Sequence, residues 1–327
     1  MAGTDSLDFD VVVFGGGGAG LWLLDALHRR GLSVCLLEAA QLGSGQTIAS
    51  QGIIHGGLKY TLGDLFAPSA KAIKAMPNRW RDCLAGSGRP NLDRTRLRAR
   101  FCYLWRTGSI SSRLAMAGAK TFLDVRPQPV ERDQWPAALA HCPQVLRLDE
   151  QVIDPGSFIR NLAEQHGDRL FKIDDPAGLA FEVTGARGGG HVTAVRITHP
   201  RDRREVRLCP KFVVFAAGRG NAALRQRVGL SAEVMQCRPL HMVMLRGTLP
   251  VLNGHCVDGA TTRVTITTDT DPASGSSVWQ VGGQVAEDGV KMDRAELVAH
   301  AHSELEASLP GIDLSGAQFA SFRVERA

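Results

Sequence analysis

Three glycines near the start of the chain have the spacing of a phosphate-binding turn. Gly15, Gly17 and Gly20 stand as G-x-G-x-x-G, with Gly18 between the last two. In such a turn the first glycine permits a tight bend, the second lets backbone amides approach a pyrophosphate, and the third lets a helix pack closely on a strand. The spacing predicts that a dinucleotide binds at the amino end of the following helix.

The residues around these glycines predict the strand, turn and helix that this chemistry needs. Residues 9–14 (FDVVVF) are almost wholly apolar, as in a central parallel strand, and residues 21–30 have helical periodicity. Residues 33–38 (SVCLLE) predict a second buried strand that ends in Glu38. Its carboxylate would accept hydrogen bonds from the adenosine ribose and repel a 2′-phosphate, which disfavours NADP. The alternative, a flexible glycine turn with a solvated Glu38, leaves the spacing unexplained.

The segment that follows distinguishes among dinucleotide-binding proteins. Residues 43–60 read GSGQTIASQGIIHGGLKY. Together with the first strand, this segment resembles the FAD-dependent D-amino-acid oxidase superfamily, most closely its glycerol-3-phosphate dehydrogenase and L-2-hydroxyglutarate dehydrogenase branches. The resemblance implies that a hydroxyl-rich loop wraps the pyrophosphate of FAD and that the I-H-x-G-x-x-Y stretch runs along the flavin ring. The FAD contacts that it implies are Ser44, Thr47, Ser50, Gln51, Gly52 and Ile54.

The same stretch contains the candidate catalytic residues. Oxidation of a C–OH or C–N carbon needs a base that takes the hydroxyl or amine proton as hydride leaves carbon. The resemblance places His55 beside the flavin, and because imidazole titrates near neutral pH we expect proton transfer there. The alternative for His55 is flavin contact alone. His241 and His255 are reserve candidates.

Two further residues are expected to contact the substrate. Lys59 and Tyr60 match an Arg-Tyr pair that contacts substrate in glycerol-3-phosphate dehydrogenases. The lysine keeps the positive charge but loses the bidentate fork, and the alternative is that it is solvent-exposed. The expected substrate is therefore small and anionic: glycerol 3-phosphate, a 2-hydroxy acid or an amino acid.

Later segments agree with this resemblance. Residues 152–158 (VIDPGSF), which open a predicted helix over 157–165, resemble the family's D-P element, where the chain returns to the flavin domain. Residues 211–221 (KFVVFAAGRGN) resemble its late strand and glycine turn, so Ala217 and Gly218 are expected to approach the cofactor. Alternating patches over 180–206 predict a small β-meander.

The overall pattern predicts an α/β fold of two interleaved domains. We expect a Rossmann-like FAD-binding domain, with a central parallel sheet and a β-meander, from residues 1–66, 150–230 and 312–327. Residues 67–149 and 231–311 are expected to form an α+β substrate domain built on an antiparallel sheet. Its predicted elements are helices over 69–84 and 293–309 and strands over 92–105, 263–268 and 277–282.

The strand predicted over 92–105 has one basic face. Arg94, Arg96, Arg98 and Arg100 alternate with uncharged residues, so they share one side of an extended strand. A solvated edge face is the favoured interpretation, and an anion-binding wall or partner patch is the alternative.

Composition limits the other functions. An apolar share of 44% and a charged share of 22% are typical of a globular protein, and a net charge of +5 without a block of like charges does not select nucleic acid. The seven scattered cysteines, never spaced as C-x-x-C, favour a reducing compartment over a disulfide framework or a zinc site. We expect a cytoplasmic protein without a transmembrane segment, with peripheral membrane contact left open.

The resemblance also bears on the carboxyl end. Relatives normally finish with a further strand and a helix, preceded by a glycine-rich turn at the flavin. The sequence ends within a predicted strand at 321–327, so we expect this element to be lacking. Two alternatives stay open beside an FAD-dependent dehydrogenase or oxidase: a truncated or non-catalytic flavin- or nucleotide-binding domain, and an NAD-dependent reductase.

Overall fold

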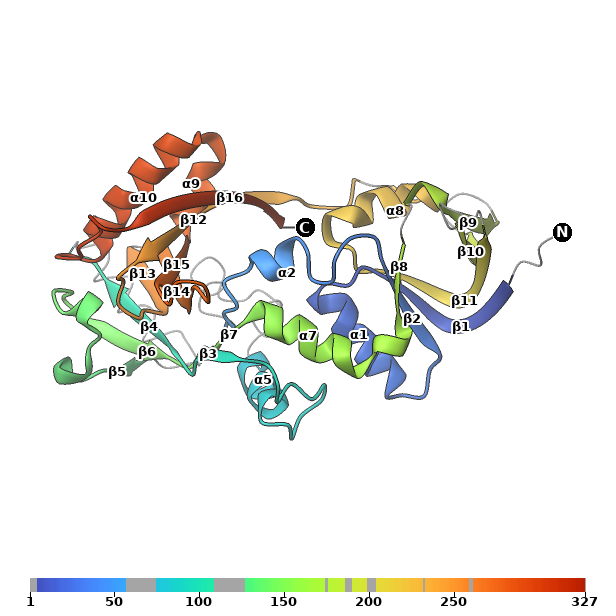
Figure 1. Cartoon of the computed structure of the whole chain (residues 1–327), viewed down its shortest axis with the longest axis horizontal. Helices are drawn as coiled ribbons and strands as arrows, with labels where there is room; N and C mark the ends of the chain where they lie inside the picture. Colours follow the sequence, from blue (N-terminus) through green and yellow to red (C-terminus); the bar gives the residue numbers. More distant parts are fainter. Residues whose placement is uncertain are drawn as a thin grey trace.

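Two large sheets lie one after the other along the long axis of the molecule (Figure 1). In this computed structural model the described residues are 5–56, 75–108, 127–173, 176–185, 190–198, 204–231, 233–258 and 261–326. Within these ranges, no helix is both long and apolar enough to cross a membrane.

The six-stranded sheet has the order β8-β2-β1-β11-β10-β9. Neighbours among β8, β2, β1 and β11 pair in parallel, and β9, β10 and β11 form an antiparallel meander. Both faces of β1 are covered: Val11 and Val13 pack with helices α1 and α7, whereas Val12 and Phe14 pack with Phe181 of the meander. The predicted Rossmann-like sheet with its meander is confirmed. Its elements are β1 (Asp5–Phe14), α1 (Gly18–His28), β2 (Val34–Glu38), α7 (Pro155–Gln165), β8 (Leu170–Lys172), β9 (Leu179–Thr184), β10 (His191–Thr198), β11 (Glu205–Phe215) and α8 (Asn221–Arg227).

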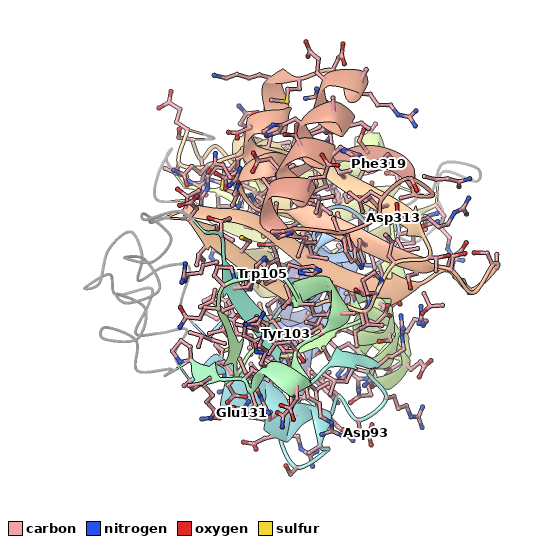
Figure 2. The ribbon with its side chains drawn as sticks, turned by 90° about the vertical axis from the view of Figure 1, so that its left-hand side faces the viewer. Asp93, Tyr103, Trp105, Glu131, Asp313 and Phe319 are labelled. Atoms are coloured by element: carbon pink, nitrogen blue, oxygen red, sulfur yellow. The ribbon has the colours of Figure 1, made fainter. Side chains whose placement is uncertain are left out.

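The eight-stranded sheet has the order β16-β12-β15-β14-β13-β4-β6-β5 and is antiparallel except where β13 runs parallel to β4. Part of its outer face is covered by α10, whose Leu297, Ala301 and Leu305 join the core of the sheet (Figure 2). Trp105 is fully buried there and donates its indole N–H to the carbonyl of Ser308 at 2.9 Å. The elements are β4 (Cys102–Arg106), β5 (Gln128–Pro129), β6 (Val145–Leu148), β12 (Arg238–Gly247), β13 (Gly254–Asp258), β14 (Thr261–Thr270), β15 (Ser277–Gly282), α9 (Gln284–Asp288), α10 (Arg294–Ser308) and β16 (Gln318–Arg326).

One predicted boundary is wrong. Residues 312–327 were expected to belong with the parallel sheet, but β16 pairs along its whole length with β12 of the eight-stranded sheet. The connection after α10 is short, so the chain returns beside β12, and Phe319 packs against the core under α10. The remaining division into two domains stays a prediction.

Short elements connect the two sheets. Helix α2 (Gln46–Ala49) and the small pair β3 (Leu97–Ala99) and β7 (Val152–Ile153) lie between them, with α5 (Met76–Leu84) below (Figure 1). The strand predicted over 92–105 is therefore two strands, β3 and β4. The first part of the helix predicted over 69–84 lies outside the described residues.

Candidate functional site

The turn between β1 and α1 is packed so closely at two glycines that no side chain fits. Gly15 has a φ of +106°, and a Cβ on Gly20 would lie 1.9 Å from the carbonyl oxygen of Gly15. Gly17 is different, because its φ of −77° suits any residue and a Cβ there would meet only the hydroxyl oxygen of Thr47, at 3.2 Å. Packing thus requires the first and third glycines, whereas a Cβ at the second would meet only one side-chain atom at the helix end.

Two polar side chains meet this turn. The Oγ1 of Thr47 accepts a hydrogen bond from the amide of Gly18 at 3.0 Å, and Glu38 accepts one from the amide of Gly16 at 2.6 Å. The other carboxylate oxygen of Glu38 accepts from the amide of Ala40 at 2.8 Å. A carboxylate has about four acceptor positions, so Glu38 keeps capacity for ribose hydroxyls. The backbone of Gly17 at the amino end of α1 and these acceptors fit the adenosine and pyrophosphate part of FAD.

The hydroxyl-rich loop runs from this turn toward the second sheet. Ser44 and Ser50 are exposed, and the Ser50 hydroxyl donates to the carbonyl of Thr47 at 2.8 Å. Gly52 has a φ of +73°, and a Cβ there would lie 2.1 Å from the carbonyl oxygen of Ile153, so contact with β7 explains this glycine. Ile54 is half-buried against the hydrophobic core formed by β1, β2, α1 and α7. FAD contacts for these residues remain predictions.

Gln51 attaches the loop to the eight-stranded sheet. Its side-chain amide donates to the carbonyls of Thr265 on β14 at 3.0 Å and Gln280 on β15 at 2.8 Å. Gln280 donates in return to the carbonyl of Ala49 at 2.7 Å. Both amide hydrogens of Gln51 are thereby used, so its side chain positions the loop against the sheet.

The turn after β11 lies against the glycine turn. A Cβ on Gly15 would lie 2.5 Å from the Cα of Ala217, and the amide of Ala217 donates to Oδ1 of Asn221 at 2.7 Å. Gly218 has a φ of +53°, and a Cβ there would meet no heavy atom within 4 Å. The structure therefore places Ala217 beside Gly15, although the two are distant in sequence, and cofactor contacts of Ala217 and Gly218 remain predictions.

Three titratable side chains meet where the loop reaches the second sheet. Glu150, between β6 and β7, has its Oε2 3.6 Å from Nδ1 of His55 and 3.2 Å from Nε2 of His255 on β13. Its Oε1 accepts a hydrogen bond from the amide of Gly56 at 2.8 Å. On the far side of the His255 ring, Nδ1 lies 3.0 Å from the hydroxyl oxygen of Thr265.

This cluster is buried and carries a carboxylate. The side chains of Glu150 and His255 are 2% and 8% exposed, whereas that of His55 is 32% exposed. Burial acts to raise the pKa of Glu150, but its interactions with His255 and His55 outweigh burial and hold that pKa well below its usual range. A base cluster of this kind can receive a proton from a group bound beside His55.

The sequence predicts only part of this cluster. It favours His55 over His255 and does not indicate Glu150, which lies in no motif of its own. The position of Glu150 just before the VIDP segment was the one available signal. His241 does not join the cluster, because its ring nitrogens lie 3.1 Å from the Gly289 carbonyl and 3.1 Å from the Ser321 hydroxyl. Lys59 and Tyr60 lie outside the described residues.

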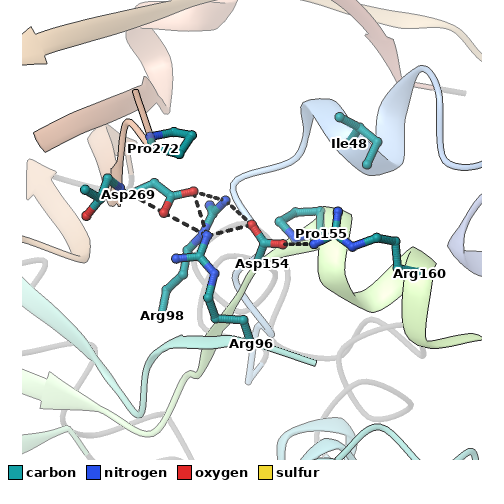
Figure 3. A pocket seen from close by; sticks show the side chains of 10 residues that line it. Ile48, Arg96, Arg98, Asp154, Pro155, Arg160, Asp269 and Pro272 are labelled. Carbon is teal, nitrogen blue, oxygen red and sulfur yellow. Dashed lines mark hydrogen bonds and ion pairs between the residues drawn. The ribbon is translucent and has the colours of Figure 1, made fainter. Parts of the chain in front are cut away.

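The favoured interpretation of the basic face, a solvated edge, is wrong for Arg98 and holds only in part for Arg96, whose side chain is ion-paired but 53% exposed. Arg96 and Arg98 reach between Asp154, at the start of α7, and Asp269 on β14 (Figure 3). The Arg98 side chain is only 12% exposed, because it lies between Asp154 and Asp269 and forms ion pairs with both. Asp154 and Asp269 balance these charges, so the face also makes a poor anion-binding wall. The network borders a pocket of about 500 Å³ that extends to Ile48 and Arg160.

Comparison with known proteins identifies the family of the chain. The model of a family described as FAD dependent oxidoreductase (DAO) matches residues 10–322. A curated relative from Pseudomonas aeruginosa, named "Probable FAD-dependent oxidoreductase", is 41% identical over 328 residues, which cover 98% of this chain and 80% of the relative.

Solved structures agree on the fold. The crystal structure of an FAD-dependent oxidoreductase from Pseudomonas aeruginosa matches with a TM-score of 0.79 and 36% identity, covering 99% of this chain and 79% of that one. An L-α-glycerophosphate oxidase from Mycoplasma pneumoniae with FAD bound matches with a TM-score of 0.66 over 97% of this chain and 83% of its own. At 14% identity, this second likeness concerns the fold alone.

Proposed function

Because this chain belongs to the DAO family of FAD-dependent oxidoreductases, we propose that it oxidises a small anionic substrate at a C–OH or C–N carbon. The observation that carries this proposal is the His55–Glu150–His255 cluster at the junction of the loop and the second sheet. The family assignment makes FAD the cofactor and sets the nicotinamide alternative aside. The match of Lys59 and Tyr60 to the substrate-contacting Arg-Tyr pair of glycerol-3-phosphate dehydrogenases supports an anionic substrate.

In this proposal the chain's own residues hold the cofactor in three places. The turn from Gly15 to Gly20 and Thr47 bind the pyrophosphate, Glu38 binds the ribose, and the loop over 50–54 with Ala217 and Gly218 adjoins the rest. FAD, when bound, accepts the hydride that leaves the substrate carbon.

The protein side of the reaction is a proton transfer. His55 takes the substrate proton, because its ring is the most exposed of the three clustered side chains. An alcohol needs such a base more than an amine does, since a fraction of an amine is already unprotonated in water near neutral pH, whereas an alcohol keeps its proton. The cluster therefore favours a C–OH substrate, with Lys59 and Tyr60 proposed to bind its anionic group.

An anaerobic reduction assay tests this function. The FAD-loaded protein is mixed with glycerol 3-phosphate, 2-hydroxyglutarate or amino acids, and loss of the visible flavin absorbance is followed. We expect an anionic hydroxy compound to reduce the flavin, and uncharged glycerol to fail. His55→Asn should slow reduction about 100-fold or more at unchanged FAD content, as expected for loss of a general base.

A matched control separates this effect from general damage. His191 is exposed on β10 of the meander, so His191→Asn should leave the reduction rate unchanged. The proposal fails if dithionite reduces the bound FAD but no member of the panel does.

We also propose that the protein works in the cytoplasm. All seven cysteines are free, and five of them are buried, which supports a reducing compartment. Fractionation of the source cells tests this location.

A further inference from the structure

We propose that Glu150 is a positioning residue that fixes the tautomers of two histidines, so that His55 presents an unprotonated Nε2 to the substrate. The use of this nitrogen in catalysis rests on the proposed function. The tautomers themselves are a property of the protein and are measurable without any substrate.

Glu150 is held in place from several sides. Its side chain is 2% exposed, and its Oε1 is fixed by the amide of Gly56 at 2.8 Å. The surrounding backbone is also tied together, because Ile54 donates to the carbonyl of Gln151 at 2.8 Å and Ile153 donates to the carbonyl of Gly52 at 2.9 Å. The remaining oxygen, Oε2, therefore has a fixed position between the two imidazole rings.

This oxygen determines where His255 carries its proton. An ionised carboxylate only accepts hydrogen bonds, so the ring nitrogen 3.2 Å from Oε2, which is Nε2 of His255, must donate. In a neutral ring Nδ1 then has a lone pair, and the Thr265 hydroxyl, 3.0 Å away, donates to it. Thr265 and Glu150 thus select the same tautomer of His255.

The same reasoning applies to His55. Its Nδ1 lies 3.6 Å from Oε2 of Glu150, so the proton of the neutral ring resides on Nδ1, facing the carboxylate. The lone pair is then on Nε2. Among the described residues, Nε2 of His55 has no hydrogen-bond partner, and the ring is partly exposed. A carboxylate that orients a histidine in this way leaves the opposite nitrogen ready to act as a base.

The charge balance favours proton uptake by this cluster. With both rings neutral, the cluster carries the single negative charge of Glu150. When the substrate hydroxyl proton moves to Nε2 of His55, the ring becomes an imidazolium and the cluster becomes neutral overall. The O–H bond breaks, the N–H bond forms, and the hydride from the adjacent carbon passes to FAD. A buried carboxylate stabilises the imidazolium because opposite charges attract strongly away from water.

Nitrogen NMR of protein labelled with nitrogen-15 at histidine tests the tautomers directly. Signals are assigned by their loss in His55→Asn and His255→Asn. We expect the wild-type protein near neutral pH to show His55 protonated at Nδ1 and His255 protonated at Nε2. A wild-type His55 protonated at Nε2 alone overturns the proposal, and this measurement needs no variant of Glu150.

Glu150→Gln tests the role in positioning. The variant keeps an oxygen that accepts from the amide of Gly56, but the other end of its side chain donates and no longer accepts. We expect His55 to shift toward the Nε2-protonated tautomer. The limiting rate of flavin reduction should fall about 10- to 100-fold, with KM and FAD content changed less than about twofold.

A matched control is a second buried acid that contacts a histidine. The Oδ1 of Asp25, on α1, lies 3.2 Å from Nε2 of His166. Asp25→Asn should alter neither the His55 tautomer nor the reduction rate. Wild-type tautomers as expected together with no reduction by any substrate would refute the proposed function and leave the tautomer assignment standing. Unchanged tautomers and rates in Glu150→Gln would refute the positioning role.

Discussion

The sharpest test of the cofactor site is Gly17→Ala. The backbone at Gly17 is already extended, with φ of −77° and ψ of −179°, so alanine adopts it without strain. The new methyl group would lie 3.2 Å from Oγ1 of Thr47, which must move by a few tenths of an ångström. The methyl would also lie at the amino end of α1, where the phosphates are proposed to approach the backbone.

The two expected effects differ in size. Alanine is a poorer N-cap than glycine, so the cofactor-free protein should lose only about 1 kcal/mol of unfolding free energy. A hydrogen bond to a charged group contributes about 1.5–3 kcal/mol, and one such bond lost at a displaced phosphate weakens FAD binding about 10- to 100-fold. FAD affinity should therefore fall much more than stability.

Two other glycines provide the comparison. Gly20→Ala should destabilise the cofactor-free protein by about 3 kcal/mol or more, because its Cβ would lie 1.9 Å from the Gly15 carbonyl oxygen. Gly316→Ala should change neither property, because its Cβ would meet nothing within 4 Å. Flavin fluorescence titration gives the dissociation constants, and urea unfolding gives the stabilities. A Gly17→Ala protein that binds FAD as tightly as wild type would refute phosphate binding at this turn.

Three further predictions concern stability, loop attachment and thiol reactivity. Burial acts to raise the pKa of Asp154, but hydrogen bonds from Ser157, Arg98 and Arg96 lower this pKa to about 2. Because the folded-state pKa lies below the ordinary value, the ionised carboxylate stabilises the fold above about pH 4. The free energy of unfolding should fall by about 2 kcal/mol through this group as the pH drops from about 5 to 2. Urea unfolding of Asp154→Asn should show a pH-dependent decrease that is smaller by this amount. Gln51→Ala removes two hydrogen bonds to the sheet, so hydrogen exchange of the loop amides over 49–54 should accelerate about tenfold, and unchanged exchange would contradict this attachment. Exposed Cys237 should react with Ellman's reagent in the native protein, whereas Cys35, whose pKa burial raises to about 12, should react only after unfolding.

The strands and helix of residues 9–38 were largely predictable because the sequence patterns that indicate them are local. A strand, a glycine turn, a helix and a second strand follow one another within residues 9–38, and each depends on neighbours close in sequence. The meander and α10 also followed from periodicity, and α10 begins with a capping box formed by Asp293 and Glu296. Such patterns identify an element and its type, but not its partner in a sheet.

The wrong predictions concern contacts between residues that are far apart in the sequence. Which sheet β16 joins depends on long-range contacts, such as Phe319 against the core under α10, and the local pattern of β16 does not reveal them. Likewise, alternating arginines predict that one strand face is basic, yet Arg98 meets Asp154 and Asp269 from distant segments. A charged side chain changes from solvated to paired according to what the fold places opposite it.

The sequence by itself determined that a dinucleotide turn is followed by a hydroxyl-rich loop and His55, since glycine spacing and strand periodicity depend on the local backbone. Only the tertiary structure decided which groups surround His55. Glu150 and His255 come from separate segments and converge because the loop, the segment before β7 and β13 are packed together at the junction of the two sheets. Long-range packing, rather than any local pattern, therefore creates the proposed proton-transfer cluster.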